Sequence, residues 1–144
     1  LHQALRLVLQ EGLPARFARH LLHHRALKTG LQAMGIQYSG DPQHCLPMLN
    51  SVLIPDGVDD MAVRGQLLNE FGIEVGGGLG PMKGKVWRIG LMGETAKKSN
   101  VLLILAALEQ CLARQGHRPQ PGAAPPQPAM CTLRGNQFPV SIWL

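Results

Sequence analysis

The chain has 144 residues, of which 45% are hydrophobic, and a formal net charge of +5. This length and apolar content fit one domain with its own core and exclude a disordered polymer. The sequence has no apolar run of about 18 residues or more, so it predicts no membrane span, and its start lacks a signal-peptide pattern. The basic residues are scattered and aromatic residues make up only 4%, which disfavours a nucleic-acid-binding face.

The first half of the chain predicts two helices and two short strands. A helical pattern covers residues 1 to about 10, and Pro14 suits the first turn of a second helix that Gly35 ends. Strand candidates follow at residues 36–38 and 48–54. The apolar residues expected on the buried side of the second helix are Phe17, Leu21, Leu27, Leu31 and Met34.

The second half predicts a helix, two strands and a final helix. Asp59 is expected to cap a helix that Gly72 ends, and residues 73–75 form a strand candidate. Thr95 or Ser99 is expected to cap the last helix. The buried stripe of this helix is expected at Val101, Leu105, Leu108 and Leu112. This order predicts an α+β fold in which a small, mostly antiparallel sheet has helices packed on one face.

The ends of the chain differ in character from its centre. Leu1 begins inside an apolar helical pattern without a cap, so we expect a fragment of a longer protein. Six of the 11 prolines lie in residues 116–144, and this composition predicts a disordered tail. The expected organisation is therefore one domain over residues 1–115, followed by a proline-rich tail over residues 116–144.

The strand predicted at residues 86–91 carries the strongest candidate for a binding residue. Its side chains alternate between two faces, which places Trp87, Ile89 and Leu91 in the core. Arg88 then lies on the opposite face beside Gly90, which leaves space next to it. A guanidinium in such a place can bind a small carboxylate through two parallel hydrogen bonds. The alternative is an arginine on a solvated strand face.

Three other patterns are weaker evidence for a functional site. Cys45, Cys111 and Cys131 form no CxxC pair, so neither a disulfide framework nor a zinc ribbon is predicted, and free thiols in a reducing compartment fit best. His20 and His24 are four residues apart, but no Cys, Asp or Glu stands at ligand spacing, so we expect no metal. The glycine-rich segment around residues 76–85 matches neither the P-loop nor the dinucleotide-binding pattern.

The segments Gly77–Pro81 and Gly84–Gly93 together resemble the C-terminal domain of the alanine–glyoxylate (serine–pyruvate) aminotransferases. These are class V pyridoxal-phosphate enzymes of fold type I. Weaker similarity reaches from the first helix to about Gln115. The resemblance implies that Arg88 binds the substrate carboxylate, and that Gly78, Leu79 and Gly80 lie near the mouth of the active site. It implies no catalytic, cofactor-binding or metal-binding residue in this chain.

The resemblance also implies a parent enzyme that moves an amino group from alanine or serine to glyoxylate or pyruvate. Such enzymes are homodimers, with no nucleic acid or membrane as partner, and are often peroxisomal or mitochondrial. The C-terminus here lacks the SKL-type peroxisomal signal. In the family, the lysine that binds pyridoxal phosphate precedes this region. None of the five lysines present has its sequence context, so the chain alone is expected to be inactive and free of cofactor; they are Lys28, Lys83, Lys85, Lys97 and Lys98.

Two further classes of function stay open at this point. One is a stand-alone carboxylate-binding or regulatory α+β module in which Arg88 binds its ligand without catalysis. The other is a nucleic-acid binder, which is supported only by the net charge and by a bare GxxG at residues 90–93.

Overall fold

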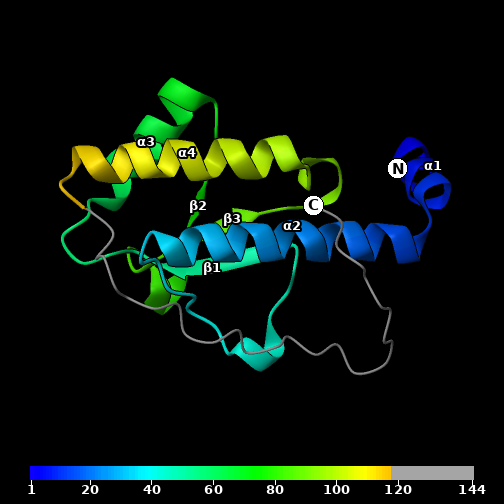
Figure 1. Ribbon diagram of the computed structural model, residues 1–144, viewed down its shortest axis with the longest axis horizontal. Coiled ribbons are helices and arrows are strands. Elements are labelled where there is room, and N and C mark those ends of the chain that lie inside the picture. Colours follow the sequence, from blue (N-terminus) through cyan, green and yellow to red (C-terminus); the bar gives the residue numbers. More distant parts are fainter. Residues whose placement is uncertain (118–144) are drawn as a thin grey trace.

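The computed structural model describes residues 1–117, with the side chain of Pro42 left aside. The predicted tail lies outside these residues, apart from its first two. The described helices are α1 (His2–Glu11), α2 (Leu13–Ala33), α3 (Asp60–Phe71) and α4 (Lys98–Arg114), and the strands are β1 (Leu49–Leu53), β2 (Gly76–Gly77) and β3 (Val86–Gly90) (Figure 1). None of these helices combines the length and the apolar character needed to cross a bilayer.

The three strands form an antiparallel sheet in the order β1-β3-β2, so β3 is central. Helices α2 and α4 run side by side across one face of this sheet, and α4 also contacts α3 (Figure 1). The predicted α+β fold, a small antiparallel sheet with helices on one face, is confirmed.

The core lies between the sheet and the helices. Trp87, Ile89 and Leu91 are each at most 5% exposed, as their alternation along the strand predicts. They pack with apolar side chains of all three neighbouring helices, among them Leu27, Leu31, Val63, Leu67, Val101 and Leu108. Val86 is buried as well, although it lies on the other face of β3, where it packs against the backbone at Gly78.

Both ends of α3 are those that the sequence predicts. Asp59 Oδ1 accepts hydrogen bonds from the backbone N–H of Met61 and Ala62, at 2.8 and 3.1 Å. Gly72 ends the helix in the left-handed conformation, with φ at 66°, which costs a glycine no strain.

The predicted cap of α4 is wrong. Lys97 precedes the helix, and no side chain caps it. The hydroxyl of Thr95 instead bonds the backbone of Met92, within the short turn that leads into the helix. The stripe expected on α4 is confirmed at Val101, Leu108 and Leu112, which are buried, whereas Leu105 is partly buried against α2 at Gly30.

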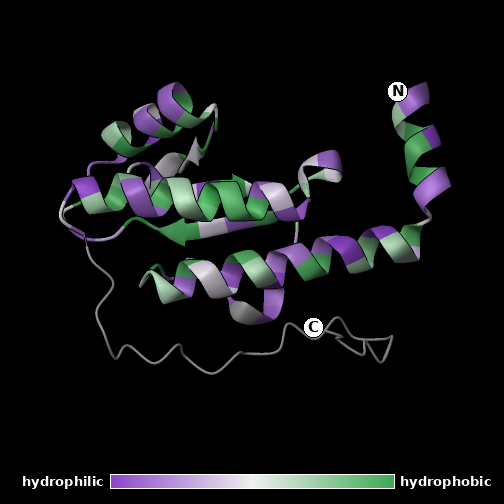
Figure 2. Cartoon of the chain, turned by 45° about the horizontal axis from the view of Figure 1, so that its top comes forward, coloured by the Kyte–Doolittle hydropathy of each residue, from purple (hydrophilic) through white to green (hydrophobic). Residues whose placement is uncertain are grey.

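Three further expectations are also wrong, one about a buried side chain and two about strands. Phe17 is 62% exposed, because the N-terminal part of α2 extends past the sheet together with α1, and α1 buries none of its residues (Figure 2). Residues 36–38 form only an isolated bridge between Tyr38 and Val52, and residues 73–75 form no strand. The pairing with β3 begins just after residues 73–75, at Gly76.

Arg19 fastens the extending helices to the body of the domain. Its Nε and Nη2 donate to the carboxylate of Glu11, at the end of α1. Its Nη1 donates to the carbonyl oxygens of Gly93 and Ala96, at 2.9 and 2.8 Å, in the turn before α4. Its guanidinium lowers the pKa of Glu11 to about 2, mainly through these hydrogen bonds.

A buried polar cluster links α2 to β1 inside the core. Asn50 is completely buried, and its Oδ1 accepts a hydrogen bond from the hydroxyl of Tyr38 at 2.8 Å and lies 2.7 Å from Nδ1 of His24. Burial lowers the pKa of His24, so the imidazole is neutral in this cluster. The side-chain amide of Asn50 donates to the carbonyl oxygen of Ile89, on the central strand.

Candidate functional site

Arg88 lies on the face of the sheet that the helices do not cover. In the antiparallel register its neighbours across the sheet are Ser51 on β1 and Gly76 on β2. Residues directly opposite each other in an antiparallel pair point to the same face. A hydroxyl and a bare glycine therefore flank the guanidinium on its two sides.

The guanidinium is held in place from one edge. Its Nε donates a hydrogen bond of 2.8 Å to the carbonyl oxygen of Gly77. Among residues 1–117, no carboxylate forms an ion pair with Arg88, and neither Nη atom makes a hydrogen bond to any of these residues. The side chain is only partly exposed, so the fork is oriented by the protein and two of its nitrogens stay available for an external anion.

The glycine-rich loop that joins β2 to β3 is tightly built. A β-carbon on Gly78 would lie 2.0 Å from the carbonyl oxygen of Met82, so this position accepts glycine alone. Gly80 has φ at 53° and begins the turn Gly80–Met82, and Leu79 is 69% exposed. The loop follows directly on Gly77, whose carbonyl holds Arg88, so its fold sets the position of that carbonyl.

On the opposite face of β2 lies a polar cluster that the sequence did not reveal. Asp60 accepts hydrogen bonds from Nε of Arg64 at 2.8 Å and from Nε1 of Trp87 at 2.8 Å. The guanidinium of Arg64 rests against Gly77, since a β-carbon there would lie 3.5 Å from its Cζ. The hydrogen bond to Arg64 is the largest cause that lowers the pKa of Asp60. The i,i+4 spacing of Asp60 and Arg64 was the available signal, but the contact to Trp87 has no local one.

Two of the three histidines of α2, His20 and His24, have structural roles. Nε2 of His20 accepts a hydrogen bond from the backbone N–H of Gly93 at 3.0 Å, and His24 belongs to the cluster with Asn50. In the part of the chain that the structure describes, no group of three or more His, Cys, Asp or Glu side chains could hold a metal ion.

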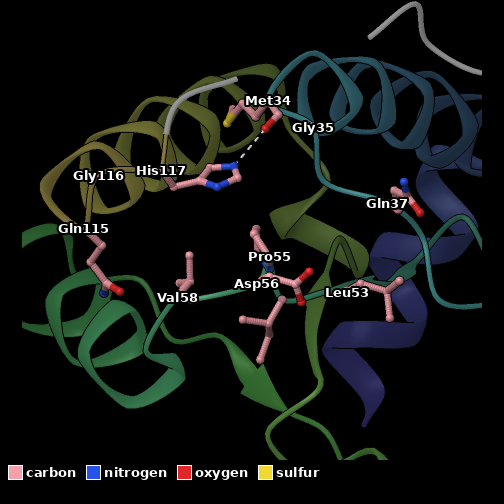
Figure 3. A pocket seen from close by; sticks show the side chains of 12 residues that line it. Met34, Gly35, Gln37, Leu53, Pro55, Asp56, Val58, Gln115, Gly116 and His117 are labelled. Carbon is pink, nitrogen blue, oxygen red and sulfur yellow. Dashed lines mark hydrogen bonds between the residues drawn. The ribbon is translucent and has the colours of Figure 1, made fainter. Parts of the chain in front are cut away.

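A pocket of about 700 Å³ lies elsewhere, between the C-terminal ends of α2 and α4 and the segment after β1 (Figure 3). His117 spans part of it, with its Nε2 3.3 Å from the carbonyl oxygen of Met34. The lining includes the carboxylate of Asp56 and contains neither lysine nor arginine. This charge does not suit an anionic ligand, so the site at Arg88 remains the candidate for carboxylate binding.

Comparison with known proteins shows which enzymes the chain resembles. No protein-family model matches the sequence. The chain is 46% identical over 124 residues to (S)-ureidoglycine–glyoxylate transaminase of Bacillus subtilis, which covers 86% of this chain and 30% of that protein. It is 40% identical over 113 residues to alanine–glyoxylate aminotransferase of Callithrix jacchus, covering 78% of this chain and 27% of the relative. The crystal structure of the Bacillus subtilis ureidoglycine–glyoxylate aminotransferase matches the fold with a TM-score of 0.77 and 47% identity, over 81% of this chain and 30% of that one. About 80% of the chain is thus similar to part of the ureidoglycine–glyoxylate and alanine–glyoxylate aminotransferases.

The family resemblance predicted from Gly77–Pro81 and Gly84–Gly93 is thereby confirmed. The chain spans about 30% of the length of these aminotransferases. The roles predicted for Arg88, Gly78, Leu79 and Gly80 stay predictions.

Proposed function

We propose that residues 1–117 form the substrate-binding small domain of a pyridoxal-phosphate-dependent aminotransferase, and that Arg88 binds the α-carboxylate of the substrate. The observation that supports this most is the state of the Arg88 guanidinium. One of its nitrogens is fixed by the carbonyl of Gly77, while neither Nη atom pairs with a carboxylate of residues 1–117. A carboxylate is the planar, bidentate partner that such a fork fits best.

We propose glyoxylate as the amino acceptor. The names of both relatives described above contain glyoxylate, whereas their amino donors differ between ureidoglycine and alanine. Alanine, serine and ureidoglycine are therefore the candidate donors, and pyruvate is a further candidate acceptor. Each of these molecules carries a carboxylate next to the reacting carbon, so a single arginine can serve all of them.

The residues of this chain do not fit pyridoxal phosphate by themselves. The cofactor needs an enclosed lysine for its covalent bond and an aspartate for its ring nitrogen. All five lysines of the chain are described, and none is buried. Lys97 pairs with Glu94 on the surface at 3.1 Å, and Lys28 lies over the ring of Tyr38. We propose that the cofactor is bound by residues outside this chain, and that the chain alone does not transaminate.

In such an enzyme the contribution of Arg88 is to position the substrate. Two parallel hydrogen bonds fix both the carboxylate and the direction of the neighbouring carbon, so the bound substrate is held in the orientation in which it reacts. The sheet supports this role, because Arg88 lies on its central strand between two hydrogen-bonded neighbours.

A carboxylate-binding module without catalysis is the second candidate. The observation in its favour is that the guanidinium is available while no buried lysine accompanies it. Homodimer formation and a peroxisomal or mitochondrial location stay predictions for the longer enzyme.

A chimera separates the two candidates. Residues 1–117 replace the matching segment of the Bacillus subtilis transaminase, and transfer of an amino group to glyoxylate is measured. Activity that is restored by this segment and lost on Arg88→Ala supports the aminotransferase. A folded chimera that keeps its cofactor and remains equally active with Arg88→Ala rules out the carboxylate role.

A further inference from the structure

Gly76 lies directly opposite Arg88 in the β2–β3 pair, and on the same face of the sheet. A β-carbon built on Gly76 would lie 3.4 Å from Nη2 of Arg88 and 3.6 Å from its Nε. These are van der Waals contacts, so a methyl group fits there and a longer side chain would extend along the guanidinium. The space beside the fork is therefore open because residue 76 has no side chain.

The hydrogen bonding of Arg88 directs a ligand toward this space. Since Nε is occupied by the carbonyl oxygen of Gly77, a bidentate carboxylate has to use the edge formed by Nη1 and Nη2. Nη2 is the nitrogen closest to Gly76. A carboxylate bound on that edge has one oxygen on Nη2, the guanidinium nitrogen closest to residue 76, so a side chain at this position that extends along the guanidinium reaches the bound molecule.

We propose that Gly76 is a specificity-determining residue, which admits 2-amino and 2-oxo acids whose substituent is larger than the methyl group of alanine or pyruvate. This inference rests on the proposed carboxylate role of Arg88. A side chain at position 76 would compete with the substituent of the substrate for the space beside Nη2. It would leave the hydrogen bonds of the carboxylate itself in place, so the smallest acids would still bind.

Gly77 provides a matched control for this position. It is the other residue of β2, and its missing side chain faces Arg64 on the opposite side of the sheet, 3.5 Å from Cζ. Neither glycine has a positive φ, so replacing either one imposes no backbone strain. Gly76→Ala and Gly77→Ala thus make the same chemical change in the same strand, and only the first reaches the side of the sheet that carries the Arg88 fork.

The test is a binding titration of the 144-residue chain followed by NMR of the Nε–Hε group of Arg88, assigned by its loss in Arg88→Ala. The ligands are glyoxylate, pyruvate and trimethylpyruvate, which share one 2-oxo acid group and differ in bulk. The wild-type chain is expected to bind all three. Gly76→Met should raise the Kd of trimethylpyruvate at least tenfold and that of glyoxylate less than threefold, whereas Gly77→Ala should leave the order of the three ligands unchanged.

Two results would overturn the inference. One is a loss of affinity in Gly76→Met that is equal for all three acids, because that would indicate general damage to the fork. The other is the same selective loss in Gly77→Ala. If Gly76→Met does not fold, Gly76→Ala replaces it, with an expected threefold selective loss for trimethylpyruvate, and its absence counts against the inference. A wild-type chain whose Arg88 signal responds to none of the acids refutes the proposed carboxylate role itself.

Discussion

Replacement of Leu108 by alanine tests how α4 is attached to the domain. Leu108 is 1% exposed and packs in the core shared by the sheet and helices α2 and α3. The change removes three carbon atoms, which amounts to roughly 2 kcal/mol at about 0.8 kcal/mol for each buried CH₂. A cavity that closes only in part adds to this loss, so the free energy of unfolding should fall by roughly 2–5 kcal/mol.

Urea unfolding of the 144-residue chain, followed by circular dichroism, measures this loss. Leu103→Ala is the matched control, because Leu103 lies on the same helix and is 47% exposed. It should cost less than about 1 kcal/mol. If the two substitutions lower the unfolding free energy equally, α4 is not held through the face that Leu108 occupies, and the packing described here is wrong.

Three further predictions concern charged groups. In the active chimera, Arg88→Lys should lower kcat/KM by an amount that corresponds to roughly 2–4 kcal/mol of transition-state stabilisation, because a compact ammonium replaces a bidentate fork and loses the bond to Gly77. An unchanged kcat/KM in steady-state assays would argue against carboxylate binding. Asp60→Asn should lower the unfolding free energy by roughly 1–3 kcal/mol, because the charged partner of Arg64 and Trp87 is lost; equal melting curves for variant and parent would show that this cluster is not stabilising. The pKa of Glu11 falls from 4.5 in the unfolded chain to about 2, so its contribution is fully present above pH 4.5 and is lost as the pH decreases toward 2. Denaturation at graded pH should therefore show a smaller acid-induced loss for Glu11→Gln, and identical pH profiles would contradict the assigned pair with Arg19.

The sequence predicted those features that depend on neighbouring residues. The cap at Asp59, the end of α3 at Gly72 and the alternation along β3 all follow from local geometry, and each is present in the structure. The face of Arg88 was predictable for the same reason, since the burial of Trp87 and Ile89 places the residue between them on the opposite side.

The features that escaped prediction depend on residues far apart in the chain. The contact between Asp60 and Trp87 spans 27 positions, and the cluster of His24 and Asn50 spans 26. Local propensity also failed at Phe17, because a helical pattern does not show where the sheet beneath the helix ends. The prediction that Thr95 caps α4 was wrong because its hydroxyl donates instead to the carbonyl oxygen of Met92, in the turn before the helix.

The hydrogen bonds of Arg19 have a consequence for the order in which contacts of the domain form during its synthesis. Glu11 is eight residues upstream, so this partner is already present when Arg19 emerges from the ribosome. The carbonyl of Gly93 is 74 residues downstream. At roughly 5–20 residues per second, translation reaches it about 4–15 s later. Until then Arg19 can form only two of its four hydrogen bonds, those to Glu11, and the bonds that join α2 to the turn before α4 form only after that segment has been made.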